Sequence, residues 1–277
     1  MSDSFAACAA AIRNYDPDRY FSALFAPADK RGFLFALYAL NHELARVAET
    51  VREPMMGEIR LQWWRDTLEG ARAGTPRKHD VAEALAETLR AVDLPQPLFD
   101  TMIDARAFDS SADTFADFAA LETYVDETSG ALMRLAARVL GAGDGYDALA
   151  REAGIAYGLA GLLRTLPFHT ARHKLYLPMG LLGILNIGED DVFAKHDGQK
   201  LKAAINQTAI HARDHLAAAR NMARPKKALA AFLPATLTPL YLKRVTRKWF
   251  DPFHHSAEVP VHRRQMALLG ASVRGRI

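Results

Sequence analysis

Residues with high helix propensity occupy nearly the whole chain, and this constrains the fold more than any other feature of the sequence. Ala, Leu, Arg and Glu dominate successive segments, whereas the alternation of Val, Ile and Thr that is typical of β-strands is scarce. Proline and glycine occur between these segments, at the positions where helices begin and end. Short connections between long helices predict an all-α fold, with residues 1–277 forming one domain.

Capping signals give the expected helix boundaries. Asp16 followed by Pro17 predicts a helix start, because an aspartate side chain caps the first turn and proline fits its first position. Thr114 with Asp117 resembles a capping box, which predicts a helix from there to Leu140. Residues 183–191 are expected to form a loop, and two helices should flank Asp251-Pro252 near the end of the chain. The other expected helices are 27–52, 54–73, 81–92, 96–108, 146–166 and 198–222.

Composition and charge exclude several classes of protein. Half of the residues are hydrophobic and 24% are charged, which is typical of a globular protein. A net charge of +3 is too small to indicate a nucleic-acid-binding protein. The single cysteine, Cys8, excludes an intramolecular disulfide and is expected to be a buried, inert thiol. The first residues lack the features of a signal peptide, so we expect a cytoplasmic location, with peripheral contact at the inner membrane left open.

Several sequence elements resemble the squalene/phytoene synthase family. They are Tyr15–Tyr20, Pro27–Tyr38, Leu163-Arg164, Tyr176–Pro178 and the segment that Tyr124 opens. The similarity runs over nearly the whole chain. Members of that family are all-α enzymes that join two prenyl diphosphates head to head. The resemblance therefore implies an isoprenoid-synthase-like helical bundle around a central cavity.

The first metal-binding motif of that family is altered in this chain. The family carries Asp-Asp-x-x-Asp after Tyr-x-x-x-Arg, and these carboxylates hold the Mg²⁺ ions that neutralise the leaving diphosphate. Tyr38 matches the tyrosine, but His42 stands in place of the arginine. Ala45 and Arg46 replace the two leading aspartates, so that only Glu49 retains a carboxylate.

The second motif of the family has lost all of its carboxylates. The family form is Asn-x-x-Arg-Asp-x-x-Glu-Asp, followed by Gly-Arg-x-Tyr-Leu-Pro. Here the three acidic positions hold Thr165, Phe168 and His169, while Arg164 and Tyr176 match the family. One carboxylate beside an arginine does not hold Mg²⁺ against water, because Mg²⁺ loses its hydration shell reluctantly. We therefore expect no metal, no cofactor and no catalytic residue, with Tyr124, Arg164 and Tyr176 as remnants of the family site.

Two further segments resemble one branch of the family more than the synthases. They are Asn41–Arg46 and Gly57–Gly70, which contains the sequence Gln-Trp-Trp-Arg. That branch includes the mitochondrial complex I assembly factor six and bacterial relatives. The resemblance implies a non-catalytic protein that assists the assembly of NADH:quinone oxidoreductase, with a subunit of that complex as partner.

Two alternatives remain open. The chain is an active head-to-head prenyl diphosphate synthase if Asp104, Asp109 or Asp126 supplies the missing ligands for Mg²⁺. It is a lipid-binding protein if the cavity holds an isoprenoid or another lipid without chemistry. No partnership with nucleic acid is expected.

Three groups of residues are candidates for binding. Glu43, Arg46 and Glu49 recur at spacings of three on a predicted helix, with His42 beside them, and form either a chain of ion pairs or part of the cavity wall. A basic cluster near the end of a predicted helix either complements the helix dipole or captures an anion. A third group is a candidate for lipid or partner contact, with one tryptophan expected in the core and the other at its rim. The basic cluster is His169, Arg172, His173 and Lys174, and the contact group is Gln62, Trp63, Trp64 and Arg65.

Overall fold

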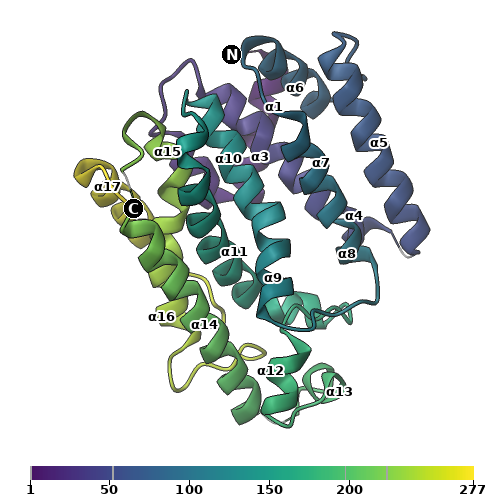
Figure 1. Cartoon of the computed structure of the whole chain (residues 1–277), viewed down its shortest axis with the longest axis vertical. Coiled ribbons are helices and arrows are strands. Elements are labelled where there is room, and N and C mark those ends of the chain that lie inside the picture. The colour runs from purple at the N-terminus through teal and green to yellow at the C-terminus, as the bar shows by residue number, and fades with distance from the viewer. Residues whose placement is uncertain (1, 52, 197, 223) are drawn as a thin grey trace.

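Helix α11 (Asp147–Thr170) is the axis of the molecule, and the other long helices surround it (Figure 1). The computed structural model describes residues 2–51, 53–196, 198–222 and 224–277, and its described residues form helices, turns and loops without a β-strand. The first half of α11 packs into an apolar core shared with α1, α3, α6 and α10, and its second half into a core shared with α9, α14 and α16. A helix that is apolar on nearly all sides is buried. The all-α prediction is confirmed.

The N-terminal part of the chain forms one side of this bundle. A first helix, α1, precedes Asp16 and was not predicted, and Asp16 caps α2 as expected, because its side chain accepts a hydrogen bond from the backbone N–H of Arg19. The helix predicted over residues 27–52 is two helices, interrupted at Arg46, and its predicted last residue, 52, lies outside the described residues. The elements are α1 (Asp3–Tyr15), α2 (Pro17–Ala23), α3 (Arg31–Ala45), α4 (Val47–Thr50), α5 (Pro54–Arg72), α6 (Asp80–Ala91), α7 (Gln96–Ala105) and α8 (Ala107–Ser110).

A π-helical turn interrupts the helix that crosses the middle of the bundle. The chain runs through α9 (Phe118–Val125), the π turn η1 (Asp126–Gly130) and α10 (Ala131–Val139). The capping prediction at Thr114 is wrong, because Asp117 caps α9 by accepting from the backbone N–H of Ala120. The helix ends near the predicted residue, and Gly141 adopts a left-handed conformation after it.

Two glycines let α11 approach this π turn closely. A Cβ atom at Gly154 would lie 2.5 Å from the Cα atom of Gly130, and one at Gly158 would lie 2.4 Å from a methyl group of Val125. Any side chain at these positions would force the two segments apart. The glycines therefore fix the place of Tyr124 and Thr128, which border the central cavity.

The C-terminal part of the chain covers the side of the molecule opposite α5 (Figure 1). Pro167 does not end α11 as predicted, since the helix continues through one more turn, and the predicted loop 183–191 contains parts of α12 and α13. The elements are η2 (Asp144–Tyr146), α12 (Met179–Ile184), α13 (Glu189–Phe193), α14 (Gly198–Arg220), η3 (Lys226–Ala228), α15 (Leu229–Phe232), η4 (Leu233–Leu237), α16 (Thr238–Val245) and α17 (Val261–Arg274).

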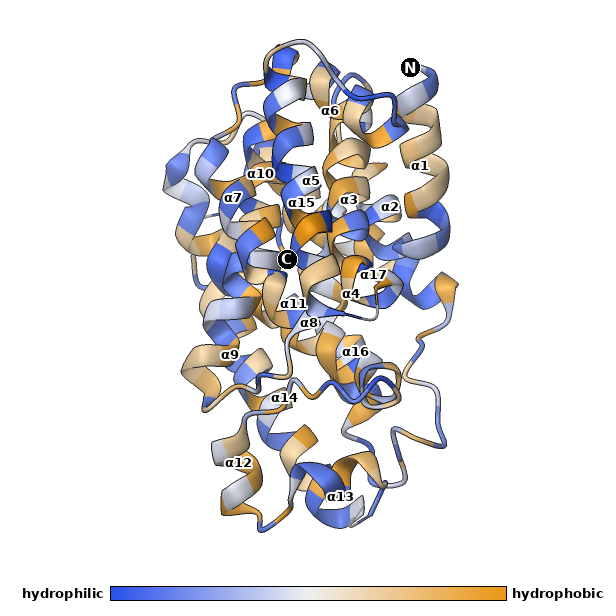
Figure 2. Cartoon of the chain, turned by 90° about the vertical axis from the view of Figure 1, so that its right-hand side faces the viewer, coloured by the Kyte–Doolittle hydropathy of each residue, from blue (hydrophilic) through white to orange (hydrophobic). Residues whose placement is uncertain are grey.

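Apolar residues concentrate where helices face one another, as the hydropathy colouring of Figure 2 shows. Cys8 lies in this core as expected, and its burial raises the pKa of the thiol to about 12. Among the described helices, none has the length and apolar character needed to span a bilayer.

Candidate functional site

A central cavity with two adjoining lobes lies beside α11. The first lobe has a volume of about 260 Å³ and is bordered by α2, α3, α9, η1 and α11. The second has a volume of about 300 Å³ and extends toward α4 and the end of α11. Arg106, Tyr124, Leu162 and Thr165 line both lobes, so the lobes meet at these four side chains.

The positions of the two altered motifs face one another across the second lobe. Ala45 and Glu49 line it from α3 and α4, and Thr165, Phe168 and His169 line it from α11. These altered motif positions therefore line one cavity, whereas the candidates His42, Glu43 and Arg46 do not line either lobe. Glu49 is the only one of the five lining positions that bears a carboxylate.

The predicted chain of ion pairs on α3 exists only in part. Arg46 Nη1 lies 3.5 Å from Glu43 Oε1, but α3 ends at Ala45 and Glu49 belongs to the separate helix α4. Glu49 forms no ion pair with a described residue, so the second link of the predicted chain is wrong. His42 lies outside the cavity lining and stacks on Tyr15 with 4.4 Å between ring centroids. Burial lowers the pKa of His42.

Asp109 joins two of the three family remnants. Its Oδ1 atom accepts hydrogen bonds from Tyr124 Oη at 2.6 Å and from Tyr176 Oη at 2.7 Å. Its Oδ2 atom lies 3.0 Å from Nη1 of Arg106, which also donates to Tyr124 Oη, while Nη2 of Arg106 donates to Asn41. Burial raises the pKa of both tyrosines, so both hydroxyls stay protonated and act as donors. We call Asp109 and these three donors the Asp109 centre.

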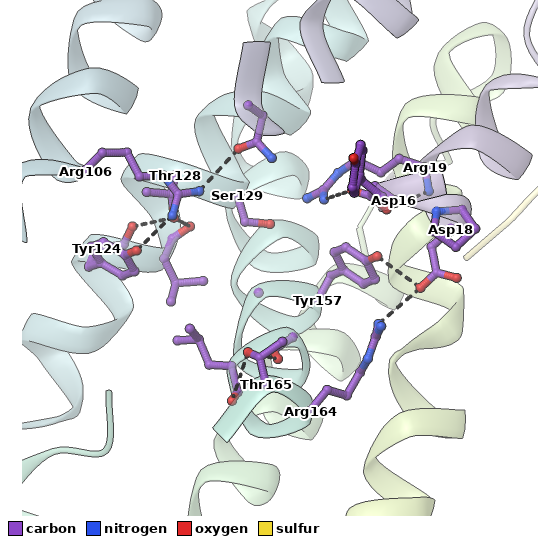
Figure 3. A pocket seen from close by; sticks show the side chains of 17 residues that line it. Asp16, Asp18, Arg19, Arg106, Tyr124, Thr128, Ser129, Tyr157, Arg164 and Thr165 are labelled. Carbon is purple, nitrogen blue, oxygen red and sulfur yellow. Dashed lines mark hydrogen bonds and ion pairs between the residues drawn. The ribbon is translucent and has the colours of Figure 1, made fainter. Parts of the chain in front are cut away.

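Asp18 accepts hydrogen bonds from Arg164, the third residue that matches the family site, and from donors on α11, α16 and α17. Its Oδ2 atom accepts from Tyr157 Oη at 3.2 Å, from Arg164 Nη1 at 3.2 Å and from Tyr241 Oη at 2.5 Å, and two of these contacts are drawn in Figure 3. Its Oδ1 atom accepts from Arg264 Nη1 at 2.6 Å. We call this arrangement the Asp18 centre. The sequence did not predict it, because the donors lie 139 to 246 residues away along the chain.

The basic cluster predicted near the end of α11 is divided among different roles. Lys174 donates to the backbone carbonyls of Ser111 at 3.0 Å and Asp113 at 2.9 Å, so its ammonium group holds a loop. Burial lowers the pKa of His169 to about 4, which makes this imidazole neutral at pH 7. His173 is exposed, and Arg172 stacks its guanidinium on Phe168 at the edge of the second lobe.

The charges lining the cavity are nearly balanced, and most are paired. Five cationic and four anionic side chains line the two lobes. Asp16 pairs with Arg19, Asp18 with Arg164 and Arg264, and Asp109 with Arg106. Glu49 is therefore the one lining carboxylate without an ion pair to a described residue. This set does not fit Mg²⁺, which requires several oxygen ligands free to face it.

The alternative ligands for Mg²⁺ do not come together either. Asp104 forms an ion pair with Arg65 on the outer surface, and Asp126 pairs with Arg134 at 2.8 Å. Within the described part of the chain, no three His, Cys, Asp or Glu side chains are placed so that they could hold a metal ion.

Apolar space next to the cavity is very small. A gap between α9, α11 and α14 has a volume of about 10 Å³ and is lined mainly by leucines, with His169 and Tyr176 at its border. A volume of this size admits about one water molecule. This gap is therefore too small to hold a prenyl chain.

The tryptophan pair on α5 is placed as predicted. Trp64 is fully buried, and Trp63 is half-buried at the rim between the guanidinium groups of Arg60 and Arg77. Gln62 donates to Asp66 on the same helix and accepts from Arg65. The group lies at the edge of the molecule, outside the central cavity.

Comparison with known proteins agrees with this geometry. The family model for squalene/phytoene synthase matches residues 12–265. The chain belongs to the squalene/phytoene synthase family. Within this family, similar proteins include NADH dehydrogenase (ubiquinone) complex I, assembly factor 6, from Bos taurus and from Homo sapiens. Each is 30% identical over 254 residues, which cover 91% of this chain and 76% of the relative. A phytoene synthase from Arthrospira platensis is 25% identical over 302 residues, covering 100% of this chain and 94% of that enzyme.

Solved structures of the family show the same fold. A dehydrosqualene synthase solved with a ligand superposes with a TM-score of 0.80 at 17% identity, covering 98% of this chain and 96% of that one. A squalene synthase from Alicyclobacillus acidocaldarius gives a TM-score of 0.72 at 18% identity, covering 98% and 94%. The prediction of an isoprenoid-synthase-like bundle around a central cavity is confirmed.

Proposed function

We propose that this chain is a non-catalytic member of the squalene/phytoene synthase family that assists the assembly of respiratory complex I. The observation that carries the proposal is the state of the cavity carboxylates. Asp16, Asp18 and Asp109 are each held by arginines, which leaves Glu49 alone facing the second lobe. Ionisation of a prenyl diphosphate needs Mg²⁺ bound by several carboxylates, and this cavity does not offer them.

The sequence relatives supply the assembly role. The mammalian proteins that are 30% identical to this chain are named as assembly factors of complex I, and the similarity covers 91% of this chain. The phytoene synthase from Arthrospira platensis covers the whole chain at a lower identity of 25%. The higher identity, together with the changed motif positions, favours the assembly role over the synthase alternative.

The narrow apolar gap counts against both other candidates. A synthase must bury two prenyl tails, and a lipid carrier must bury at least one acyl or prenyl chain. The gap beside Leu121 and Leu166 admits about one water molecule. The central lobes are larger, but charged and hydroxyl side chains line much of them.

A genetic experiment tests the proposal directly. Deletion of the gene in its host should lower the amount of assembled complex I on native gels, while the other respiratory complexes keep their levels. Expression of the wild-type chain should restore assembly. The Glu49→Gln variant should restore it equally well, because the proposed role does not use the remaining carboxylate. Normal complex I in the deletion strain would contradict the proposal.

A biochemical experiment tests the synthase alternative. The purified chain is incubated with farnesyl or geranylgeranyl diphosphate and Mg²⁺, and released diphosphate is measured. We expect release no greater than with heat-denatured protein. Release that depends on Mg²⁺ and is lost in Glu49→Gln would restore the synthase alternative.

A further inference from the structure

Positive charge is concentrated in the C-terminal part of the chain. Residues 215–277 contain 12 Lys and Arg against 2 Asp and Glu, whereas residues 1–214 contain 23 against 30. The modest net charge of +3 therefore conceals two regions of opposite sign. The basic region includes the end of α14 together with α16 and α17, which lie along one side of the molecule (Figure 1). A charge separation of this kind directs that side toward anionic surfaces.

Helix α17 has two apolar faces. Leu268 and Ala271 point into the core, whereas Met266, Leu269 and Val273 are 66%, 48% and 81% exposed. Spacings of three and four place the last three residues in one stripe on the outer face. The helix contains no acidic residue, and Arg263 and Arg274 are exposed along one flank of the stripe. An apolar stripe flanked by arginines is typical of helices that lie in the interface of a membrane.

A group of arginines without acidic partners lies next to this helix. Arg220, at the end of α14, is exposed and is close to Arg274 and Arg276, and none of the three forms an ion pair within the described residues. Partial burial and these two neighbouring charges lower the pKa of Arg220. Cations kept together without counter-ions are stabilised when an anion binds among them.

A groove beside Arg220 extends the basic surface. It lies between α14 and α16, has a volume of about 500 Å³, and is lined by Arg213, Arg220 and Lys243 with no carboxylate. Leu216 and Pro239 also line the groove. Three cations beside apolar side chains suit a phosphate headgroup attached to an acyl chain.

We propose that the outer face of α17, with Arg220, Arg274 and Arg276 beside it, docks on an anionic phospholipid bilayer. Met266, Leu269 and Val273 enter the interface, and the arginines contact lipid phosphates. The helix lies on the membrane and does not cross it. This inference does not depend on the assembly role, because it rests on exposure and charge alone.

A bilayer fits these features better than other partners. A nucleic acid would satisfy the arginines but would leave the exposed methionine, leucine and valine in water. A second copy of the chain would bring like charges together, since the same arginines flank the stripe on both copies. An anionic lipid surface satisfies the charges and also buries the stripe.

The test uses the purified full chain and sedimentation with vesicles. We expect binding to vesicles of phosphatidylcholine mixed with phosphatidylglycerol, weaker binding as salt is raised, and little binding to phosphatidylcholine alone. The double variant Arg274→Gln/Arg276→Gln should bind about thirty-fold more weakly, since each cation near the surface contributes on the order of a factor of five. Leu269→Ser/Val273→Ser should lose roughly tenfold through reduced apolar burial.

A matched control lies on the other side of the molecule. Met55 and Ile59 on α5 are 64% and 56% exposed, so Met55→Ser/Ile59→Ser changes a comparable apolar surface without touching α17. This control should bind vesicles as the wild type does, and circular dichroism confirms that every variant is folded. Three results would overturn the proposal: no binding to anionic vesicles, equal binding by the arginine variant, or a dimer that only Leu269→Ser/Val273→Ser dissolves. Failure here would leave the assembly role standing, because that role is measured by complex I levels.

Discussion

The Asp18 centre and the Asp109 centre are built from the same kinds of residue but differ in what they connect. Each places a largely buried aspartate, 2% and 6% exposed at its side chain, among tyrosine hydroxyls and arginines at the border of the central cavity. Asp18 joins α2 to α11, α16 and α17, so it ties the beginning of the chain to its end. Asp109 joins α8 to Tyr124 and Tyr176, two positions that match the synthases.

The two centres show which family positions this chain shares with the synthases and which it does not. Arg164, Tyr124 and Tyr176 match the family, yet each is engaged by an aspartate of the surrounding structure. The changed positions, Ala45 and Thr165, have no comparable structural partner. In this chain the matching residues also connect parts of the bundle, whereas Ala45 and Thr165 stand at positions where the synthase motifs carry metal-binding aspartates.

The largest expected effect is the loss of the negative charge at Asp18. Asp18→Asn leaves Arg164 and Arg264 without their buried counter-ion, and breaking a buried pair from one side costs about 3–5 kcal/mol. Asp109→Asn leaves only Arg106 uncompensated, in a site that opens to the cavity, so a loss of about 2 kcal/mol is expected. Urea unfolding followed by circular dichroism measures both.

An exposed aspartate provides the control for this comparison. Asp144→Asn changes the same group on the surface, and its free energy of unfolding should stay within about 0.5 kcal/mol of the wild type. If Asp18→Asn and Asp109→Asn lost the same free energy of unfolding, Asp18 would contribute no more to stability than Asp109 does.

A second, smaller effect concerns pH on the Asp109 side. His169 packs against the ring of Tyr176 with 4.6 Å between ring centroids, and burial lowers its pKa to about 4. The unfolded chain has a histidine pKa near 6.5 and therefore binds more protons below that pH. The free energy of unfolding is therefore highest above about pH 6.5. It falls by about 2–3 kcal/mol as the pH decreases toward about 4, because the unfolded chain then binds a proton that the folded chain does not.

Unfolding curves at a series of pH values test this effect. The free energy of unfolding of the wild type should fall more steeply between pH 6.5 and 4 than that of His169→Gln, which has no titrating group at this position. His173→Gln, four residues along and exposed, should leave the slope unchanged. Parallel curves for the wild type and His169→Gln would show that His169 is not held neutral by burial.

The sequence predicted the fold and the location of the cavity but not the side chains that organise it. Helix propensity, capping and family motifs are local patterns, so they can be read from the sequence. They were sufficient to predict the helices, the cap at Asp16 and the cavity positions around Ala45 and Thr165. The Asp18 centre depends on residues up to 246 positions apart, and no local pattern records such a contact. Pro167 was misleading because α11 continues through it to Thr170, although proline lacks the N–H that would donate to the carbonyl of Leu163.

The smallest expected effect is the loss of single tyrosine hydroxyls, and it depends on how many donors Asp109 Oδ1 and Asp18 Oδ2 each have. Tyr124→Phe and Tyr176→Phe should each cost about 1 kcal/mol, because Asp109 Oδ1 keeps the other tyrosine as a donor. The double variant leaves that oxygen without either donor, so its cost should exceed the sum of the two single changes. At Asp18 Oδ2, Tyr157→Phe with Tyr241→Phe still leaves Arg164, and their costs should add more nearly. Urea unfolding of the six variants measures the two coupling energies, and equal coupling would mean that the donors at each centre are interchangeable.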